Sequence, residues 1–148
     1  MKILLVEGRF YEDISNELAG GAIAVIEKAG FQFERLFVPG ALEIPAAINF
    51  ANESGKFVGF VALGCIIRGE TYHFEVVSNE SARGISDLAM HKNIAIGNGI
   101  LTVESDDQAW ARAATNQGNK GGAAASACIE MIKIKEQFLP ENNSRRKN

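Results

Sequence analysis

Residues 63–77, "LGCIIRGETYHFEVV", bring together residue types that can do chemistry. Within this stretch, the polar residues 68–73 separate two apolar runs. If a strand ends before the patch and a helix begins in it, unpaired N–H groups and a partial positive charge at the helix start favour phosphate or carboxylate. Gly69 allows close backbone approach to the anion, Thr71 adds a hydroxyl, and His73 can move protons near neutral pH. The stretch predicts phosphate binding beside a proton-transfer group.

The apolar pattern around this patch predicts alternating strands and helices, because spacings of three and four mark helices and short apolar runs mark buried strands. Continuously apolar strands are typical of a parallel sheet covered on both faces. We expect an α/β three-layer sandwich over residues 1–140, with a four-stranded parallel sheet and a flavodoxin-like shape, followed by a disordered basic tail at 141–148. The expected strands span residues 2–6, 31–38, 57–63 and 94–102, and the expected helices span residues 14–29, 44–51, 74–88, 106–114 and 122–136.

Ligands of open α/β sheets bind outside the carboxyl ends of the strands. Four segments in the sequence are placed there: "EGRFYED", "VPGALEIP", "GCIIRGETYH" and "NGILTVES". The first provides Arg9 and Phe10, and the second brings Glu43 close to a Pro-Gly turn. We therefore expect these side chains to share one crevice with His73.

Each of these residues also has a structural explanation. Thr71 can be a helix N-cap, His73 a surface residue, and Phe10 part of the core. Glu43 can be a first-turn acid that the helix dipole favours, and Arg68 is better explained as a salt-bridge partner. The functional interpretation depends on their convergence at one end of one sheet.

Other motifs are weaker. Cys65 with His73 suggests a Cys–His hydrolase, but a nucleophile elbow needs small neighbours, and Ile66 and Ile67 would crowd the thiol. "GNG" at residues 97–99 lacks the third glycine of a dinucleotide fingerprint, and "GNKGG" lacks the Ser or Thr of a P-loop. The His and Cys residues have no metal-ligand spacing. We therefore expect no metal site.

The composition of the chain indicates which partners the protein can bind and which cellular compartment suits it. The chain has 148 residues, of which 47% are hydrophobic, and a net charge of −3, which argues against nucleic acid as a partner. Cys65 and Cys128, both among small or apolar residues, suit a reducing cytoplasm better than a disulfide. The apolar core of "MKILLVEGRF" is too short for a signal peptide, and no segment approaches 18 apolar residues. We expect a cytoplasmic protein that binds no membrane.

Five motifs together resemble the 6,7-dimethyl-8-ribityllumazine synthase family of riboflavin biosynthesis: "GRF", "VPGALEIP", "ALGCIIRGETYHFEVV", "NGILTVES" and "GNKG". They stand in the family's order and spacing, and the resemblance covers residues 2–134. It implies condensation of 5-amino-6-(D-ribitylamino)uracil with 3,4-dihydroxy-2-butanone 4-phosphate, with release of phosphate and water and without cofactor or metal.

The resemblance also implies roles for particular residues, with His73 as the proton-transfer residue. The residues expected to contact the pyrimidine substrate are Phe10, which stacks on the ring, Ala41, Leu42 and Glu43 on the ribityl side, the backbone of Cys65, Ile66 and Ile67 at the uracil edges, and Lys120. The residues expected to hold the phosphate are Glu70, Thr71 and Arg112. Two positions depart from the family pattern: Tyr11 stands where Asn is frequent, and Asn98 stands where an aromatic residue is frequent and offers hydrogen bonds instead of ring stacking.

Two other function classes are compatible with the resemblance: a non-catalytic protein that binds lumazine or flavin, and a scaffold that serves only as a shell. The presence of Thr71, His73 and Arg112 favours the enzyme, since a flavin binder needs no butanone-phosphate site. Members of the family form pentamers, decamers or sixty-subunit shells, so we expect at least a pentamer. Asn98 and Arg112 are expected beyond the fourth strand, at the sheet edge that faces the next subunit, so that neighbouring subunits share each site.

Overall fold

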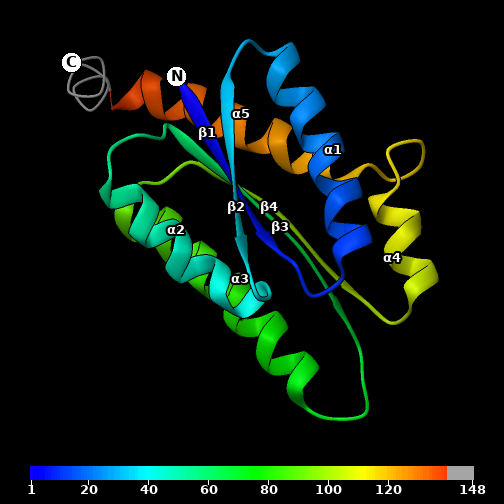
Figure 1. Cartoon of the computed structure of the whole chain (residues 1–148). Helices are drawn as coiled ribbons and strands as arrows, with labels where there is room; N and C mark the ends of the chain where they lie inside the picture. Colours follow the sequence, from blue (N-terminus) through cyan, green and yellow to red (C-terminus); the bar gives the residue numbers. More distant parts are fainter. Residues whose placement is uncertain (140–148) are drawn as a thin grey trace.

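Four parallel strands form the predicted sheet, in the order β2–β1–β3–β4 (Figure 1). The computed structural model describes residues 1–139, and the predicted tail at 141–148 lies outside them. β3 extends beyond its predicted end at residue 63, so Cys65, Ile66 and Ile67 lie in the strand and not in the loop that follows. The strands are β1 (Lys2–Gly8), β2 (Gln32–Val38), β3 (Gly59–Ile67) and β4 (Ile96–Val103).

Helices cover both faces of this sheet, which confirms the three-layer α/β prediction. They are α1 (Glu12–Lys28), α2 (Ile44–Glu53), α3 (His73–Lys92), α4 (Asp106–Ala113) and α5 (Lys120–Phe138), with a short 3-10 helix, η1 (Ala41–Glu43), before α2. In Figure 1, α2 and α3 lie on one side of the sheet, and α1, α4 and α5 lie on the other.

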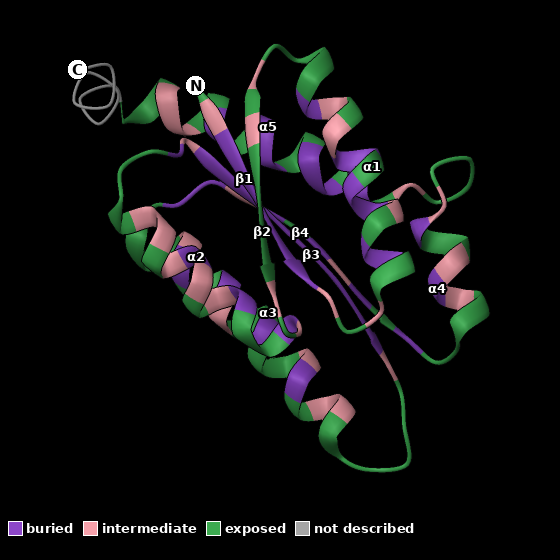
Figure 2. Ribbon diagram, viewed as in Figure 1, coloured by how far each residue is buried: buried purple, intermediate pink, exposed green. Residues whose placement is uncertain are grey.

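Two apolar cores lie between the three layers, one on each face of the sheet. In β1, Ile3 and Leu5 belong to the core on the α1 and α5 side, whereas Leu4 and Val6 belong to the core on the α2 and α3 side. This alternation follows from the two-residue period of a strand. β1 and β3 are almost wholly buried, as Figure 2 shows, because each has a strand on both sides and helices on both faces.

The expectation that every strand is buried is wrong for the two outer strands. Most residues of β2 are exposed, and β4 exposes Asn98 and Thr102. Both strands are edges of the sheet, so within residues 1–139 no strand pairs with their outer sides. Burial of an edge strand depends on the strand order, which an apolar run does not reveal.

Helix α5 packs closely against β4 at Gly97. A Cβ atom at Gly97 would lie 1.8 Å from the carbonyl oxygen of Ala124. That oxygen belongs to helix backbone and cannot rotate away as a side chain can. A glycine at position 97 is therefore required by packing, and it brings α5 close to the strand that carries Asn98.

We expect Gly97→Ala to lower the free energy of unfolding by about 3 kcal/mol, the upper end of the usual overpacking cost, because backbone must move. Thermal unfolding measures the change. Gly20→Ala is the matched control: position 20 lies in α1, no atom stands within 4 Å of its added Cβ, and alanine is the better helix former. Equal melting temperatures for Gly97→Ala and the wild type would contradict the close packing of α5 on β4.

Candidate active site

The strand order places a ligand crevice between β1 and β3. The chain leaves β1 toward β2 on one side, and it leaves β3 toward β4 on the other, so the connections diverge at their carboxyl ends. A cavity of about 350 Å³ lies at this position. Its lining comes from three of the four segments expected from the sequence: the end of β1, the Pro-Gly turn after β2, and the end of β3 with the start of α3. The fourth segment, "NGILTVES", does not line this cavity, and neither does Arg9. The lining includes Phe10, Ala41, Leu42, Glu43, Cys65, Ile66, Ile67, Thr71 and His73.

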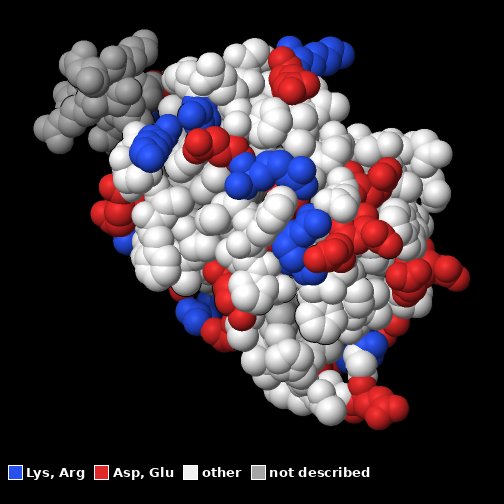
Figure 3. All heavy atoms as spheres, in the orientation of Figure 1, with Lys and Arg blue, Asp and Glu red and all other residues white. Residues whose placement is uncertain are grey.

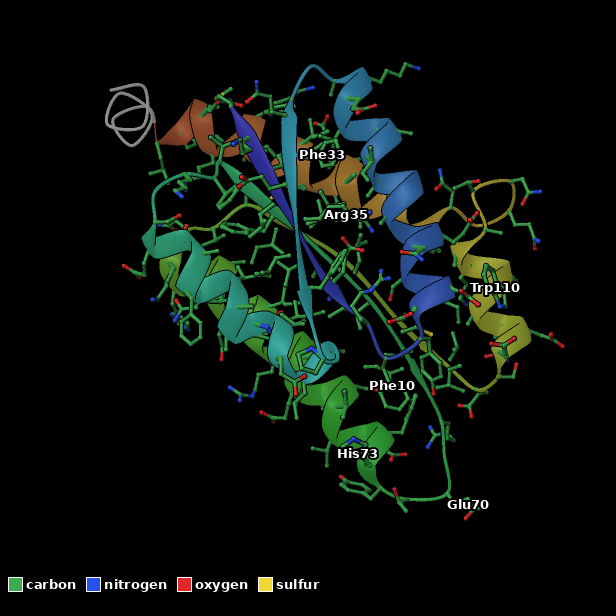
Figure 4. The ribbon with its side chains drawn as sticks, viewed as in Figure 1. Phe10, Phe33, Arg35, Glu70, His73 and Trp110 are labelled. Atoms are coloured by element: carbon green, nitrogen blue, oxygen red, sulfur yellow. The ribbon has the colours of Figure 1, made fainter. Side chains whose placement is uncertain are left out.

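Phe10 stands in the loop between β1 and α1, and its side chain is 76% exposed. The alternative explanation, that Phe10 is part of the apolar core, is therefore wrong. Its ring meets that of Tyr11 edge to face, with ring centroids 4.9 Å apart, and both rings line the cavity. In Figure 4, Phe10 lies close to His73 at the start of α3. An exposed ring at the mouth of a cavity is suited to stack on a planar heterocycle.

The turn after β2 forms a second wall. A Cβ atom at Gly8 would lie 2.9 Å from the carbonyl carbon of Gly40, so the end of β1 and this turn touch. The turn leads into η1, where Ala41 is buried, whereas Leu42 and Glu43 are exposed. Glu43 occupies the N-cap position of α2 but makes no capping hydrogen bond with its side chain. Its carboxylate is thus available to accept hydrogen bonds from hydroxyl groups in the cavity.

The floor of the cavity is the end of β3. The ladder between β1 and β3 stops at the pair Glu7–Leu63, whereas the ladder between β3 and β4 continues to Ile67–Val103. Residues 64–67 therefore present toward the cavity a backbone edge that no described strand covers. Backbone N–H and C=O groups on such an edge can recognise the alternating donors and acceptors of a uracil.

Cys65 is poorly suited to act as a nucleophile. Its side chain is buried, and burial raises the pKa of the thiol to about 11. The thiol is therefore protonated at neutral pH, whereas a catalytic cysteine needs the thiolate. Together with the crowding expected from Ile66 and Ile67, this argues against the Cys–His hydrolase interpretation.

The start of α3 closes the cavity. Tyr72, not Thr71, is the N-cap of this helix, and His73 is its first residue. The Thr71 hydroxyl accepts a long hydrogen bond of 3.4 Å from the backbone N–H of His73. Thr71 and His73 are both exposed and line the cavity, but Glu70 does not line it and points outward at the loop tip in Figure 4. The start of α3 is thus exposed beside the cavity, and anion binding there stays a prediction.

Arg68 forms salt bridges, as predicted from the sequence. Its guanidinium donates to Glu104 at 2.8 Å (Nε–Oε2), pairs with Glu75, and lies 4.3 Å from the ring centre of Phe74. Its hydrogen bond also holds the pKa of the Glu75 carboxyl below its usual value. These contacts join the ends of β3 and β4 to the first turn of α3 and so fix the helix that carries His73. Both carboxylates lie within motifs noted in the sequence, but the spacing of those motifs along the chain does not show that Glu75 and Glu104 meet Arg68.

The remaining predicted residues lie elsewhere. Asn98, Arg112 and Lys120 line a separate cavity of about 400 Å³ along β4, and none of them lines the cavity around His73. Asn98 lies within β4 and not beyond it, and its side-chain oxygen accepts a 2.9 Å hydrogen bond from Ile100 N–H, so that oxygen is already engaged. Arg112 donates to the carbonyl of Gln108 in its own helix at 3.1 Å. The predicted site residues thus line two separate cavities of one chain.

Comparison with known proteins identifies the family. The model of the 6,7-dimethyl-8-ribityllumazine synthase family matches residues 1–136. The chain belongs to this family. A lumazine synthase from Bartonella tribocorum is 56% identical over 137 residues, covering 92% of this chain and 91% of the relative. A lumazine synthase from Bartonella henselae is 54% identical over 140 residues (93% and 90%), and 6,7-dimethyl-8-ribityllumazine synthase 1 from Rhizobium meliloti is 54% identical over 144 residues (94% of each chain).

Membership in the lumazine synthase family confirms the resemblance drawn from the five motifs. Within residues 1–139, no helix is both long and apolar enough to cross a membrane. The same part of the chain contains no group of three or more His, Cys, Asp or Glu side chains that could hold a metal ion.

Proposed function

We propose that this protein condenses 5-amino-6-(D-ribitylamino)uracil with 3,4-dihydroxy-2-butanone 4-phosphate to 6,7-dimethyl-8-ribityllumazine, releasing phosphate and water in the penultimate step of riboflavin biosynthesis. It is then an enzyme of the transferase class. The observation that carries the proposal is the cavity between β1 and β3, in a chain of the lumazine synthase family, where an exposed ring, an open backbone edge and an open helix start meet.

The pyrimidine substrate fits the half of the cavity that Phe10 and β3 form. Its ring stacks on Phe10, and its polar edges bond to the backbone of residues 65–67. Its ribityl chain extends along Ala41 and Leu42 toward Glu43, whose carboxylate accepts from the hydroxyls. Each contact uses a group that faces this cavity.

The phosphate of the second substrate is placed at the start of α3, where backbone N–H groups and the Thr71 hydroxyl can donate to it. Glu70 contributes only backbone there, because its carboxylate would repel the phosphate. His73 then stands beside the reacting carbon atoms. The 5-amino group of the uracil attacks the ketone, and one water leaves to form an imine. Loss of a proton from the neighbouring carbon then permits elimination of phosphate, and the enol that results tautomerises to a ketone. The ribitylamino nitrogen attacks this ketone, and loss of a second water closes the ring. A single imidazole can serve several of these proton transfers.

The second group of residues completes the site from a neighbouring subunit in this proposal. Arg112 and Lys120 line a cavity at the β4 edge, apart from His73, so their substrate contacts need a second copy of the chain. A cyclic, head-to-tail assembly such as a pentamer brings the β4 edge of one subunit to the His73 cavity of the next. Arg112 is then the second phosphate ligand, with a fork of donors that suits phosphate oxygens, and Lys120 lies near the pyrimidine.

The proposed partners are thus two small molecules and further copies of the chain. On the face in Figure 3, Lys and Arg side chains are interspersed with Asp and Glu and form no continuous basic stripe, which supports a function without nucleic acid. Both cysteines are unpaired and buried, which supports a cytoplasmic location.

A fluorescence assay tests the proposed reaction. Purified protein with both substrates should produce lumazine fluorescence together with one inorganic phosphate for each lumazine, and omission of either substrate should abolish both signals. Reactions without protein give the uncatalysed rate. Tight binding of lumazine or riboflavin without any acceleration would instead identify a binding protein.

A further inference from the structure

Glu7 is a buried carboxylate that the proposed reaction does not use. It lies in β1, its side chain is 0% exposed, and it is absent from the lining of the cavity around His73. Burying a charge is costly unless the charge is paired and hydrogen-bonded. Arg35 in the neighbouring strand β2 meets this need, since its Nε and Nη2 atoms donate to the two carboxylate oxygens at 2.8 Å each. This hydrogen bond also raises the pKa of Arg35.

Arg9 is a second cation on the same carboxylate. Its Nη1 atom lies 3.2 Å from Glu7 Oε1 and 2.9 Å from Asn16 Oδ1 in α1. Arg9 and Arg35 both lie over the ring of Phe37, at 4.6 and 5.1 Å from its centre. Because Arg35 already binds both oxygens of Glu7, neutralising the buried charge does not by itself require Arg9.

Arg9 lies in the loop that presents Phe10. The backbone N–H of Arg9 donates to the carbonyl of Val38 at 2.9 Å, and the buried hydroxyl of Ser15 donates to the carbonyl of Gly8 at 2.6 Å. The loop is thus held by its backbone on both sides and by the Arg9 side chain between β1 and α1. The next residue, Phe10, has a ring that is 76% exposed. An exposed ring keeps one orientation only if the residues beside it are held in place.

We infer that Glu7 and Arg9 are positioning residues for the pyrimidine substrate, acting through Phe10. Glu7 anchors the Arg9 guanidinium, Arg9 holds the loop against Asn16, and the loop keeps the Phe10 ring ready to stack. Figure 4 shows Arg35 on β2 and Phe10 beyond the end of β1. The inference rests on the proposed function, which assigns the pyrimidine to Phe10.

Arg9→Met is the best test, because it retains the bulk of the side chain and leaves Glu7 paired with Arg35. We expect the KM for the pyrimidine to rise about tenfold, since a displaced contact costs binding, while the KM for the butanone phosphate and the melting temperature hardly change. The matched control is Arg83→Met, which removes an exposed arginine that pairs with Glu80 and Asp87 in α3. It should change neither KM.

A double-mutant cycle with Phe10→Ala separates positioning from general stability. If Arg9 acts through Phe10, Arg9→Met should have no further effect on the pyrimidine KM once the ring is absent. Additive effects, an equal change in both KM values, or no change in either would overturn the inference. A wild-type protein that forms no lumazine would overturn the proposed function instead, and fluorescence titration of the same variants with lumazine would still test the role of Arg9.

Discussion

His73→Ala is expected to lower turnover about 10²-fold while leaving the affinity for both substrates nearly intact. His73 is the first residue of α3, and its side chain is exposed and lines the cavity, so its loss removes a proton-transfer group without disturbing the core. Loss of a general acid or base typically costs 10²- to 10⁴-fold. Stacking and hydrogen bonds that hold the two substrates together remain in the variant, which is why we expect the lower end of this range.

Single-turnover fluorescence measures the chemical step apart from binding. The matched control is His91→Ala, since position 91 is an exposed histidine near the end of the same helix and does not line the cavity. Turnover of His91→Ala should equal that of the wild type. A His73→Ala variant that also turns over like the wild type would remove His73 from the mechanism and leave proximity as the source of the rate.

Activity is expected to return when two inactive chains are mixed, His73→Ala and Arg112→Ala. Each alone should be almost inactive. In particles assembled at random from equal amounts, about a quarter of the sites should take an intact His73 cavity from one chain and an intact Arg112 from its neighbour. The physical basis is the separation of the two cavities on a single chain.

A second mixture makes this test decisive. Wild-type chains mixed equally with a chain that carries both substitutions should also give about a quarter of the wild-type activity if neighbouring chains share each site, but about half if each chain has a complete site. Distinguishable tags and mass spectrometry verify that the particles are mixed. Activities of zero in the first mixture and half in the second would show that His73 and Arg112 serve from one chain.

Much of the fold follows from local pattern. The helices and strands lie close to their predicted ranges because each buries an apolar stripe or run, and the positions of Phe10, Glu43 and His73 follow from the rule that ligands bind at strand ends. The end of β3 was placed too early. Its last residues are held by pairing with β4, more than thirty positions further along the chain, and no local signal marks that pairing.

Contacts between distant residues explain the other differences. Glu7 meets Arg35 across 28 positions, and Arg68 meets Glu104 across 36, so neither pair forms a motif that can be read along the chain. The same limit applies to the site as a whole. Convergence in one crevice was predicted for Phe10, Glu43 and His73, whereas Asn98 and Arg112 were expected at the sheet edge beyond the fourth strand. Arg112 and Lys120 lie in helices α4 and α5 beside that edge strand. Their distance from His73 is set by packing.

β3 continues for four residues, 64–67, after its pairing with β1 has ended. This has a consequence for how such a site can change in evolution. Recognition by main-chain atoms is insensitive to which side chains residues 64–67 carry, so substitutions there that keep the strand packed can accumulate without loss of the ligand. A change in length is different. Inserting or deleting one residue in β3 would turn every later side chain to the opposite face and exchange the N–H and C=O groups on the open edge. If the proposed main-chain recognition holds, we therefore expect selection at this position to act on the number of residues more strongly than on their identity.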